Sequence, residues 1–174
     1  MKRRSLLLGG LAGAVGAGLL LRPQERGAPH APYFSGLSDA LDQASLATPR
    51  LVVDRELLRA NIKTLGQHID DRFAYRIVAK SLPSIPLLQE VMQESGSRRL
   101  MLFHQPFVNR VAESIPEADV LLGKPMPVAA AAAFYSQRPA NSFDATRQLR
   151  WLLDTPERVS QYAQLAAQLD EKLL

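Results

Sequence analysis

Short apolar runs alternate with amphipathic segments along most of this chain, from about residue 48 onward. The apolar runs predict β-strands over residues 51–53, 75–80, 100–103, 120–122 and 149–153. The segments after them carry apolar residues at helical spacing and predict helices that begin near residues 54, 84, 106, 128 and 155. Strands that alternate with helices predict a parallel sheet with right-handed connections.

Residues with strong positional preferences support several of these helix boundaries. Asp54 and Ser84 precede predicted helices, where a side-chain oxygen can accept a hydrogen bond from a free backbone N–H group. Gly96 suits the end of a helix because glycine adopts the left-handed conformation readily. Pro156 stands at the first position of the last helix, where its missing N–H group costs nothing.

The order of the predicted elements favours a barrel. No glycine-rich phosphate-binding loop follows a predicted strand, which disfavours a dinucleotide-binding fold. We therefore predict an α/β fold, namely a partial (β/α)8 TIM-type barrel. It would have about four βα units, one preceding strand and an N-terminal signal or anchor helix. The predicted domains are a targeting segment and linker over residues 1–30 and the barrel part over residues 48–174.

The first residues have the layout of an export signal. Lys2, Arg3 and Arg4 precede an apolar run over residues 6–21, and the Arg3-Arg4 pair resembles a twin-arginine signal. The alternative is a short membrane anchor, because residues 5–21 lie at the lower limit of the length that spans a bilayer. Residues 22–32 then form a linker. We expect a periplasmic protein, or one anchored to the inner membrane with membrane contact through residues 5–21.

Composition excludes several classes of function. The chain has 174 residues and a net charge of +4, but much of the excess of basic residues lies in the first thirty residues. The remaining body is nearly neutral, so it lacks the basic stripe that nucleic-acid binding needs. The absence of cysteine excludes disulfides, thiolate zinc sites and a cysteine nucleophile.

Four predicted strands are followed by polar residues that can act in catalysis. These are Lys80, His104, Lys124 and Asp154. In a parallel barrel the carboxyl ends of the strands converge on one face, where active sites lie. Each residue also has an ordinary explanation: Lys124 as a solvated charge, His104 as a loop or core residue, and Asp154 as a helix cap.

The strand that ends at Lys80 carries a second cation on the same face. Side chains alternate along a strand, so Arg76 and Lys80 point to the same side. Two cations on an apolar strand are costly unless an anion binds there. An amine that lies beside another cation and is shielded from water loses its proton more readily and can attack an aldehyde. A structural ion pair or a lysine that extends to solvent would explain the pattern equally well.

Four segments, in order, resemble one enzyme group. The first is Thr48-Pro49-Arg50-Leu51-Val52-Val53-Asp54 with Leu57 and Asn61-Ile62, and the second is Arg76-Ile77-Val78-Ala79-Lys80-Ser81. The third is Asp119-Val120-Leu121-Leu122-Gly123-Lys124-Pro125, and the fourth is Leu152-Leu153-Asp154-Thr155-Pro156-Glu157. Together they resemble the D-threonine aldolase and D-serine dehydratase group, which is related to the amino-terminal domain of alanine racemase.

The resemblance implies an enzyme that uses pyridoxal phosphate. Lys80 would be the catalytic lysine that forms a Schiff base with the cofactor, and Arg76, His104 and Asp154 would contribute to cofactor binding. The substrate would be a D-amino acid, cleaved or dehydrated at a β-hydroxyl group. The sequences after Lys80 and at His104 depart from the group's pattern, which leaves the substrate open.

The same resemblance implies that the chain is the amino-terminal half of a larger enzyme. The strand over residues 51–53 would belong to a separate β-domain, and divalent-metal ligands would lie only in the carboxy-terminal part. We expect little activity from such a fragment alone. Three alternatives stay open: an amino-acid racemase, a non-catalytic cofactor-binding relic, and a membrane-anchored interaction domain. Homodimer formation is also left open.

Overall fold

The computed structural model describes residues 27–46, 48–70, 72–170 and 173, so the expected signal or anchor over residues 5–21 lies outside the described part. The chain divides into two compact units, Met1–Val52 and Val53–Leu174, and each is described by itself. In the first unit, helix α2 (Pro32–Gln43) begins with a proline and has no buried residue. The sequence analysis assigned no element to this segment. No helix in the described residues is long and apolar enough to cross a membrane.

The second unit contains a four-stranded parallel sheet. Its strands are β1 (Ile77–Val78), β2 (Arg99–Leu102), β3 (Asp119–Leu122) and β4 (Leu149–Arg150). They lie side by side in chain order, β1-β2-β3-β4. Ile77 pairs with Leu100, Leu100 with Val120, and Val120 with Leu149. The predicted α/β class and the parallel sheet are therefore confirmed.

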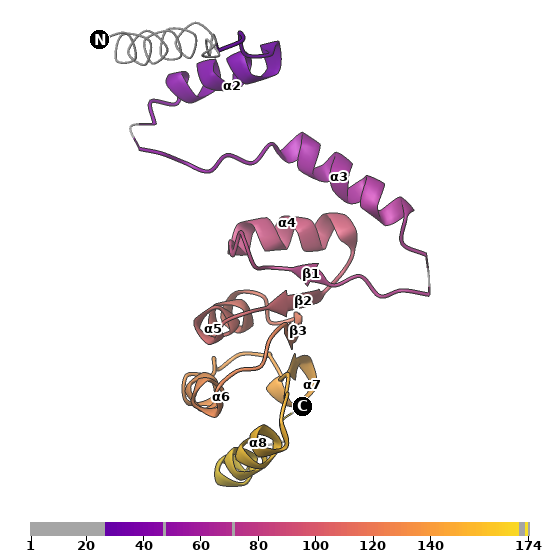
Figure 1. The fold of residues 1–174 in the computed structure, drawn as a ribbon, viewed down its shortest axis with the longest axis vertical. Helices are drawn as coiled ribbons and strands as arrows, with labels where there is room; N and C mark the ends of the chain where they lie inside the picture. The colour runs from indigo at the N-terminus through magenta and orange to yellow at the C-terminus, as the bar shows by residue number, and fades with distance from the viewer. Residues whose placement is uncertain (1–26, 47, 71, 171–172, 174) are drawn as a thin grey trace, which may run out of the picture. The chain divides into compact units, whose positions relative to one another are not determined.

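Helices connect consecutive strands of the sheet: α4 (Ile85–Ser95) joins β1 to β2, α5 (Gln105–Ser114) joins β2 to β3, and α6 (Val128–Ser136) with the short α7 (Ala145–Gln148) joins β3 to β4. Helix α3 (Arg55–Gln67) precedes β1, and α8 (Pro156–Leu169) follows β4. Right-handed connections between consecutive parallel strands place their helices on the same face. Figure 1 shows α4, α5 and α6 on one side of the strands, and neighbouring helices pack together from α3 to α6 and from α6 to α8.

The predicted caps are confirmed at three positions. The Asp54 side chain accepts a hydrogen bond from Leu57 N at 3.0 Å, and Gly96 ends α4 with φ 67°. Pro156 begins α8, whose N-cap Thr155 accepts from Arg158 N at 3.1 Å. Ser84 occupies the N-cap position of α4, but its side chain makes no capping hydrogen bond. Pro86, at the second helical position, provides no N–H group there to be capped.

Alternate residues of each strand pack under the helices and form the core. Fully buried side chains on this face include Leu100, Leu102, Val120, Leu122 and Leu149. The ring of Phe134 on α6 is also fully buried, and it meets the rings of Phe143 and Trp151 edge-on. Burial of these side chains supplies the main driving force for folding of this unit.

The other residues of the strands form a surface that we call the helix-free face. It comprises residues 76, 78 and 80, residues 99, 101 and 103, residues 119, 121 and 123, and residues 150 and 152. No described helix covers it: Val78 is 57% exposed and Leu152 is 40% exposed. Parallel sheets are normally covered on both faces, so this uncovered apolar surface is unusual.

The predicted strand over residues 51–53 does not form in the described chain. Leu51 is 73% exposed, and no described strand pairs with the segment. A β-strand needs a neighbour for its N–H and C=O groups, so an apolar run without one stays extended but unpaired. The strand predicted over residues 149–153 is shorter than expected, because pairing with β3 ends at Arg150.

Candidate functional site

Lys80 lies at the carboxyl end of β1. Pairing of this strand continues to Ala79, whose N–H group donates to Met101 O at 3.0 Å, and Lys80 follows directly. Its side chain is exposed on the helix-free face. The Lys80 Nζ atom lies 5.6 Å from the centroid of the Phe103 ring, within the range of a cation–π interaction. It forms no hydrogen bond or ion pair with another described residue.

Phe103 and Gly123 continue the line of Lys80 across the sheet. A Cβ atom at Gly123 would lie 2.5 Å from Cε1 and Cζ of Phe103, so only glycine leaves room for this ring. The Gly123 N–H group donates to Leu102 O at 2.8 Å and extends the pairing of β3 with β2. Lys80, Phe103 and Gly123 therefore form a row at the carboxyl ends of three neighbouring strands, which we call the carboxyl-end row.

Arg76 is occupied by other groups of the protein at the opposite end of β1. Its guanidinium donates to Asp119 Oδ1 at 2.8 Å and to the carbonyl oxygens of Leu100 and Asp119 at 2.9 Å. Arg150 also donates to Asp119 Oδ1, at 2.9 Å. The anion expected beside Arg76 is thus the Asp119 carboxylate. Four residues of extended chain, about 13 Å, separate the Arg76 and Lys80 backbones.

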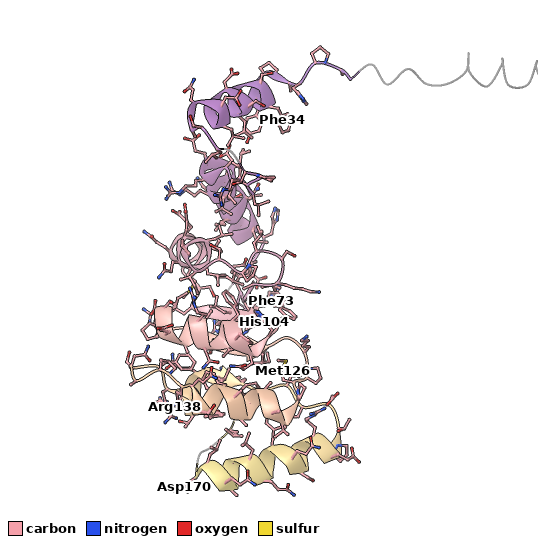
Figure 2. The ribbon with its side chains drawn as sticks, turned by 90° about the vertical axis from the view of Figure 1, so that its left-hand side faces the viewer. Phe34, Phe73, His104, Met126, Arg138 and Asp170 are labelled. Carbon is pink, nitrogen blue, oxygen red and sulfur yellow. The ribbon has the colours of Figure 1, made fainter. Side chains whose placement is uncertain are left out.

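His104 lies on the other side of its strand from Phe103, because successive side chains alternate. It precedes α5, at the start of that helix (Figure 2). The centroid of the His104 ring lies 5.9 Å from that of the Phe107 ring. Both rings line a surface pocket of about 580 Å³, together with Ser84 and Arg110. Lys80 does not line this pocket. The structure therefore does not bring His104 together with Lys80.

Lys124 and Asp154 lie at the carboxyl ends of β3 and β4 and are both exposed. Asp154 Oδ1 is 3.9 Å from Arg158 Nε, while Thr155 caps α8, so Asp154 is not the cap. Three strand spacings, about 14 Å, separate β4 from β1. The predicted residues thus share one end of the sheet, but Lys80 and Asp154 lie on its two opposite edges.

The chemistry available at this end of the sheet is that of an accessible primary amine beside an aromatic ring. A lysine amine can condense with an aldehyde. The described residues contain no group of three or more metal-ligating side chains. Comparison with protein-family models, with curated proteins and with solved structures finds no match.

The sequence analysis did not select Phe103 or Arg150 and named Asp119 only within a resemblance. Phe103 could have been selected, since alternation along residues 100–103 places it on the face opposite Leu102, and it ends its strand as Lys80 ends the preceding one. The ion pair between Arg76 and Asp119 could not be predicted from the sequence pattern. It depends on the register between strands that are 43 residues apart in the chain.

Proposed function

We propose that Lys80 binds pyridoxal phosphate and that this chain is the amino-terminal part of an enzyme acting on D-amino acids. The reaction would be aldol cleavage or dehydration of a β-hydroxy amino acid, as in the group that the sequence resembles. The observation that carries the proposal is the exposed Lys80 amine at the carboxyl end of a parallel strand, on the helix-free face. In parallel barrels, this end of the strands bears the active site.

The barrel is part of the same proposal. Strands in consecutive order with their helices on one face form the repeating unit of a (β/α)8 barrel, and the helix-free face would then line the barrel interior. A doubly wound sheet has helices on both faces and a change in strand order. The described sheet has neither feature, which supports the barrel over the doubly wound alternative.

The carboxyl-end row offers two of the groups that would hold pyridoxal phosphate, namely an amine and a flat apolar surface. Lys80 provides the amine, and the Phe103 ring limits where that amine can lie and offers a flat apolar surface. Arg76 does not fit a cofactor-binding role, because Asp119 and the Leu100 carbonyl already take its hydrogen bonds. His104 lies on the other side of its strand. Pyridoxal phosphate, when bound, acts as an electron sink for bond cleavage at the amino-acid substrate.

The test is to trap the cofactor on the purified full chain. The protein is incubated with pyridoxal phosphate, reduced with borohydride, digested and mapped by mass spectrometry. We expect the pyridoxyl label on Lys80 and its loss in Lys80→Arg. Lys124→Arg is the matched control, since Lys124 is also exposed at a strand end, and it should keep the label. A label spread evenly over surface lysines, or retained in Lys80→Arg, would overturn the proposal.

The substrate class needs a separate measurement. Incubation of the cofactor-loaded protein with D-threonine, D-serine and alanine distinguishes cleavage, dehydration and racemisation by their products. Turnover of one of the three would identify the reaction class and would exclude the non-catalytic alternative.

Export is also part of the proposal, because Arg3 and Arg4 precede the apolar run. Replacement of both arginines by lysine should retain the protein in the cytoplasm, as measured by cell fractionation. Unchanged export of this variant would contradict the twin-arginine route.

A further inference from the structure

We propose that the surface pocket between the first turns of α4 and α5 binds a small organic carboxylate with a flat apolar body. We call it the α4–α5 pocket. It is lined by residues 83–86 and, at the start of α5, by His104, Pro106, Phe107 and Arg110. Its volume of about 580 Å³ lies within the range of small-molecule sites. Lys80 does not line it, so this proposal does not depend on the proposed function.

The sequence at the start of α5 places two rings and a cation on the same side of the helix. His104, Phe107 and Arg110 follow one another at intervals of three residues. Side chains three residues apart are neighbours on a helix surface, and all three line the pocket. The buried Phe107 ring lies at 33° to the His104 ring, with 5.9 Å between their centroids. The two rings therefore form an apolar wall that ends at the Arg110 guanidinium.

The start of α4 adds further apolar surface to the pocket. Pro83, Ile85 and Pro86 contribute carbon atoms, and Ser84 contributes a hydroxyl group. Pro86 and Pro106 each stand at the second position of their helix. Proline has no backbone N–H group, so both helices lack one of the donors that a helix start normally offers to an anion. The pocket therefore suits a ligand with an apolar body better than it suits a bare phosphate ion.

The polar side chains of the pocket are available to a ligand. Arg110, His104 and Ser84 are exposed, and their side chains form no hydrogen bond or ion pair with another described residue. None of the lining residues is acidic. A guanidinium group binds a carboxylate through two parallel hydrogen bonds, and an imidazole N–H or a hydroxyl group can donate to the same anion. We therefore place the carboxylate of the ligand at Arg110 and its apolar body against the rings.

Three other surface pockets of the described residues lack this combination. The pocket beside Arg98 also contains Glu117, and the pocket between α3 and α4 contains both Lys63 and Glu94. In each of these, a carboxylate in the same pocket offsets the positive charge. The pocket between α6 and α8 is lined by no charged residue. Of these four, the α4–α5 pocket is the one that combines an uncompensated cation with an apolar wall.

The first experiment is an NMR titration of the ¹⁵N-labelled full chain, without cofactor, with benzoate as the probe. We expect saturable shifts confined to the starts of α4 and α5 and to the Arg110 side-chain N–H group, with a dissociation constant of about 1 mM or lower. Benzyl alcohol lacks the charge, acetate lacks the ring, and inorganic phosphate lacks an apolar body. Each should bind at least about tenfold more weakly than benzoate. Absence of saturable shifts with benzoate, or equal binding of any of the other three probes, would overturn the proposal.

The second experiment tests the role of Arg110 with variants. Arg110→Gln should weaken benzoate binding at least about tenfold, and Arg110→Lys should keep part of the affinity because it keeps the charge. Arg98→Gln is the matched control, since Arg98 is also an exposed arginine that lines a pocket, and it should leave the affinity unchanged. The same spectra show whether each variant is folded. Unchanged affinity in Arg110→Gln, or an equal loss in Arg98→Gln, would overturn the proposal.

The outcomes separate this proposal from the proposed function. Lys80→Arg should bind benzoate as tightly as the natural chain does, because Lys80 lies outside the α4–α5 pocket. Loss of benzoate binding in Lys80→Arg would place the carboxylate elsewhere and overturn the proposal. A pyridoxyl label on Lys80 in a chain that does not bind benzoate overturns only the carboxylate site. Benzoate binding in a chain that takes no label on Lys80 overturns only the cofactor assignment.

Discussion

Removal of the Asp119 charge should destabilise the second unit through the loss of one particular ion pair. Asp119 Oδ1 accepts hydrogen bonds from both Arg76 and Arg150, at 2.8 and 2.9 Å. The Arg76 side chain is only 19% exposed, whereas that of Arg150 is 42% exposed. A hydrogen bond to a charged group contributes roughly 1.5–3 kcal/mol when shielded from solvent, and an exposed ion pair contributes about 0.2–1 kcal/mol. Asp119→Asn should therefore lower the free energy of unfolding by about 2 kcal/mol, mostly through Arg76.

Double-mutant cycles with Arg76→Gln and Arg150→Gln separate the two contributions. We expect a coupling energy of about 1.5 kcal/mol between Asp119 and Arg76 and about 0.5 kcal/mol between Asp119 and Arg150. The assay is urea unfolding at one protein concentration, followed by the fluorescence of Trp151, the single tryptophan of the chain, which is buried next to β4. Equal coupling to both arginines, or a loss below about 0.5 kcal/mol in Asp119→Asn, would refute the reasoning.

Three further predictions concern single positions. Gly96→Ala should cost about 1 kcal/mol in urea unfolding, because φ at this position is 67° although no atom lies within 4 Å of the added Cβ; an unchanged midpoint would contradict this. Phe134→Ala should cost about 3–5 kcal/mol, because this ring is fully buried, and a loss below about 1 kcal/mol would show that the aromatic cluster is not packed as described. Burial raises the pKa of Tyr162 to about 12, so its phenol should ionise well above the ordinary value of 10 in an absorbance titration. Since the unfolded state ionises first, the stability that the neutral phenol contributes is present below pH 10 and is lost as the pH rises towards 12; Tyr162→Phe should flatten this part of the stability profile.

The elements that were predicted correctly are those specified by local signals. Asp54, Gly96 and Pro156 each act on the nearest turn of backbone, and the boundaries that they predicted are found in the structure. The alternation of strands and helices also predicted the parallel sheet, because each connecting helix requires its two strands to run in the same direction. Helix α2 was missed, because its mixed pattern lies between a proline-rich linker and an unpaired apolar run.

The features that could not be predicted depend on contacts between distant parts of the chain. The apolar residues 51–53 satisfy every local criterion for a strand, yet none of the described strands pairs with them. Arg76 and Lys80 share a face as predicted, but the register of β1 to β3 sets Asp119 beside Arg76. The sequence analysis had left open that an ion pair within the protein would explain the two cations on this face, and the structure contains such a pair at Arg76.

The consecutive strand order also has a consequence for how the protein folds. Every strand in the described residues pairs only with the strands next to it in the chain. The helices that pack together are also consecutive, except α6 and α8, which have only the short helix α7 between them. Neighbouring strands are joined by a single crossover that contains a helix, as between Ile77 and its partner Leu100. These crossovers are short for a parallel sheet, so the entropy lost on closing them is modest and folding should be fast for this class of sheet. A nascent chain can add each strand and helix to the edge of what has already formed, in the order of synthesis.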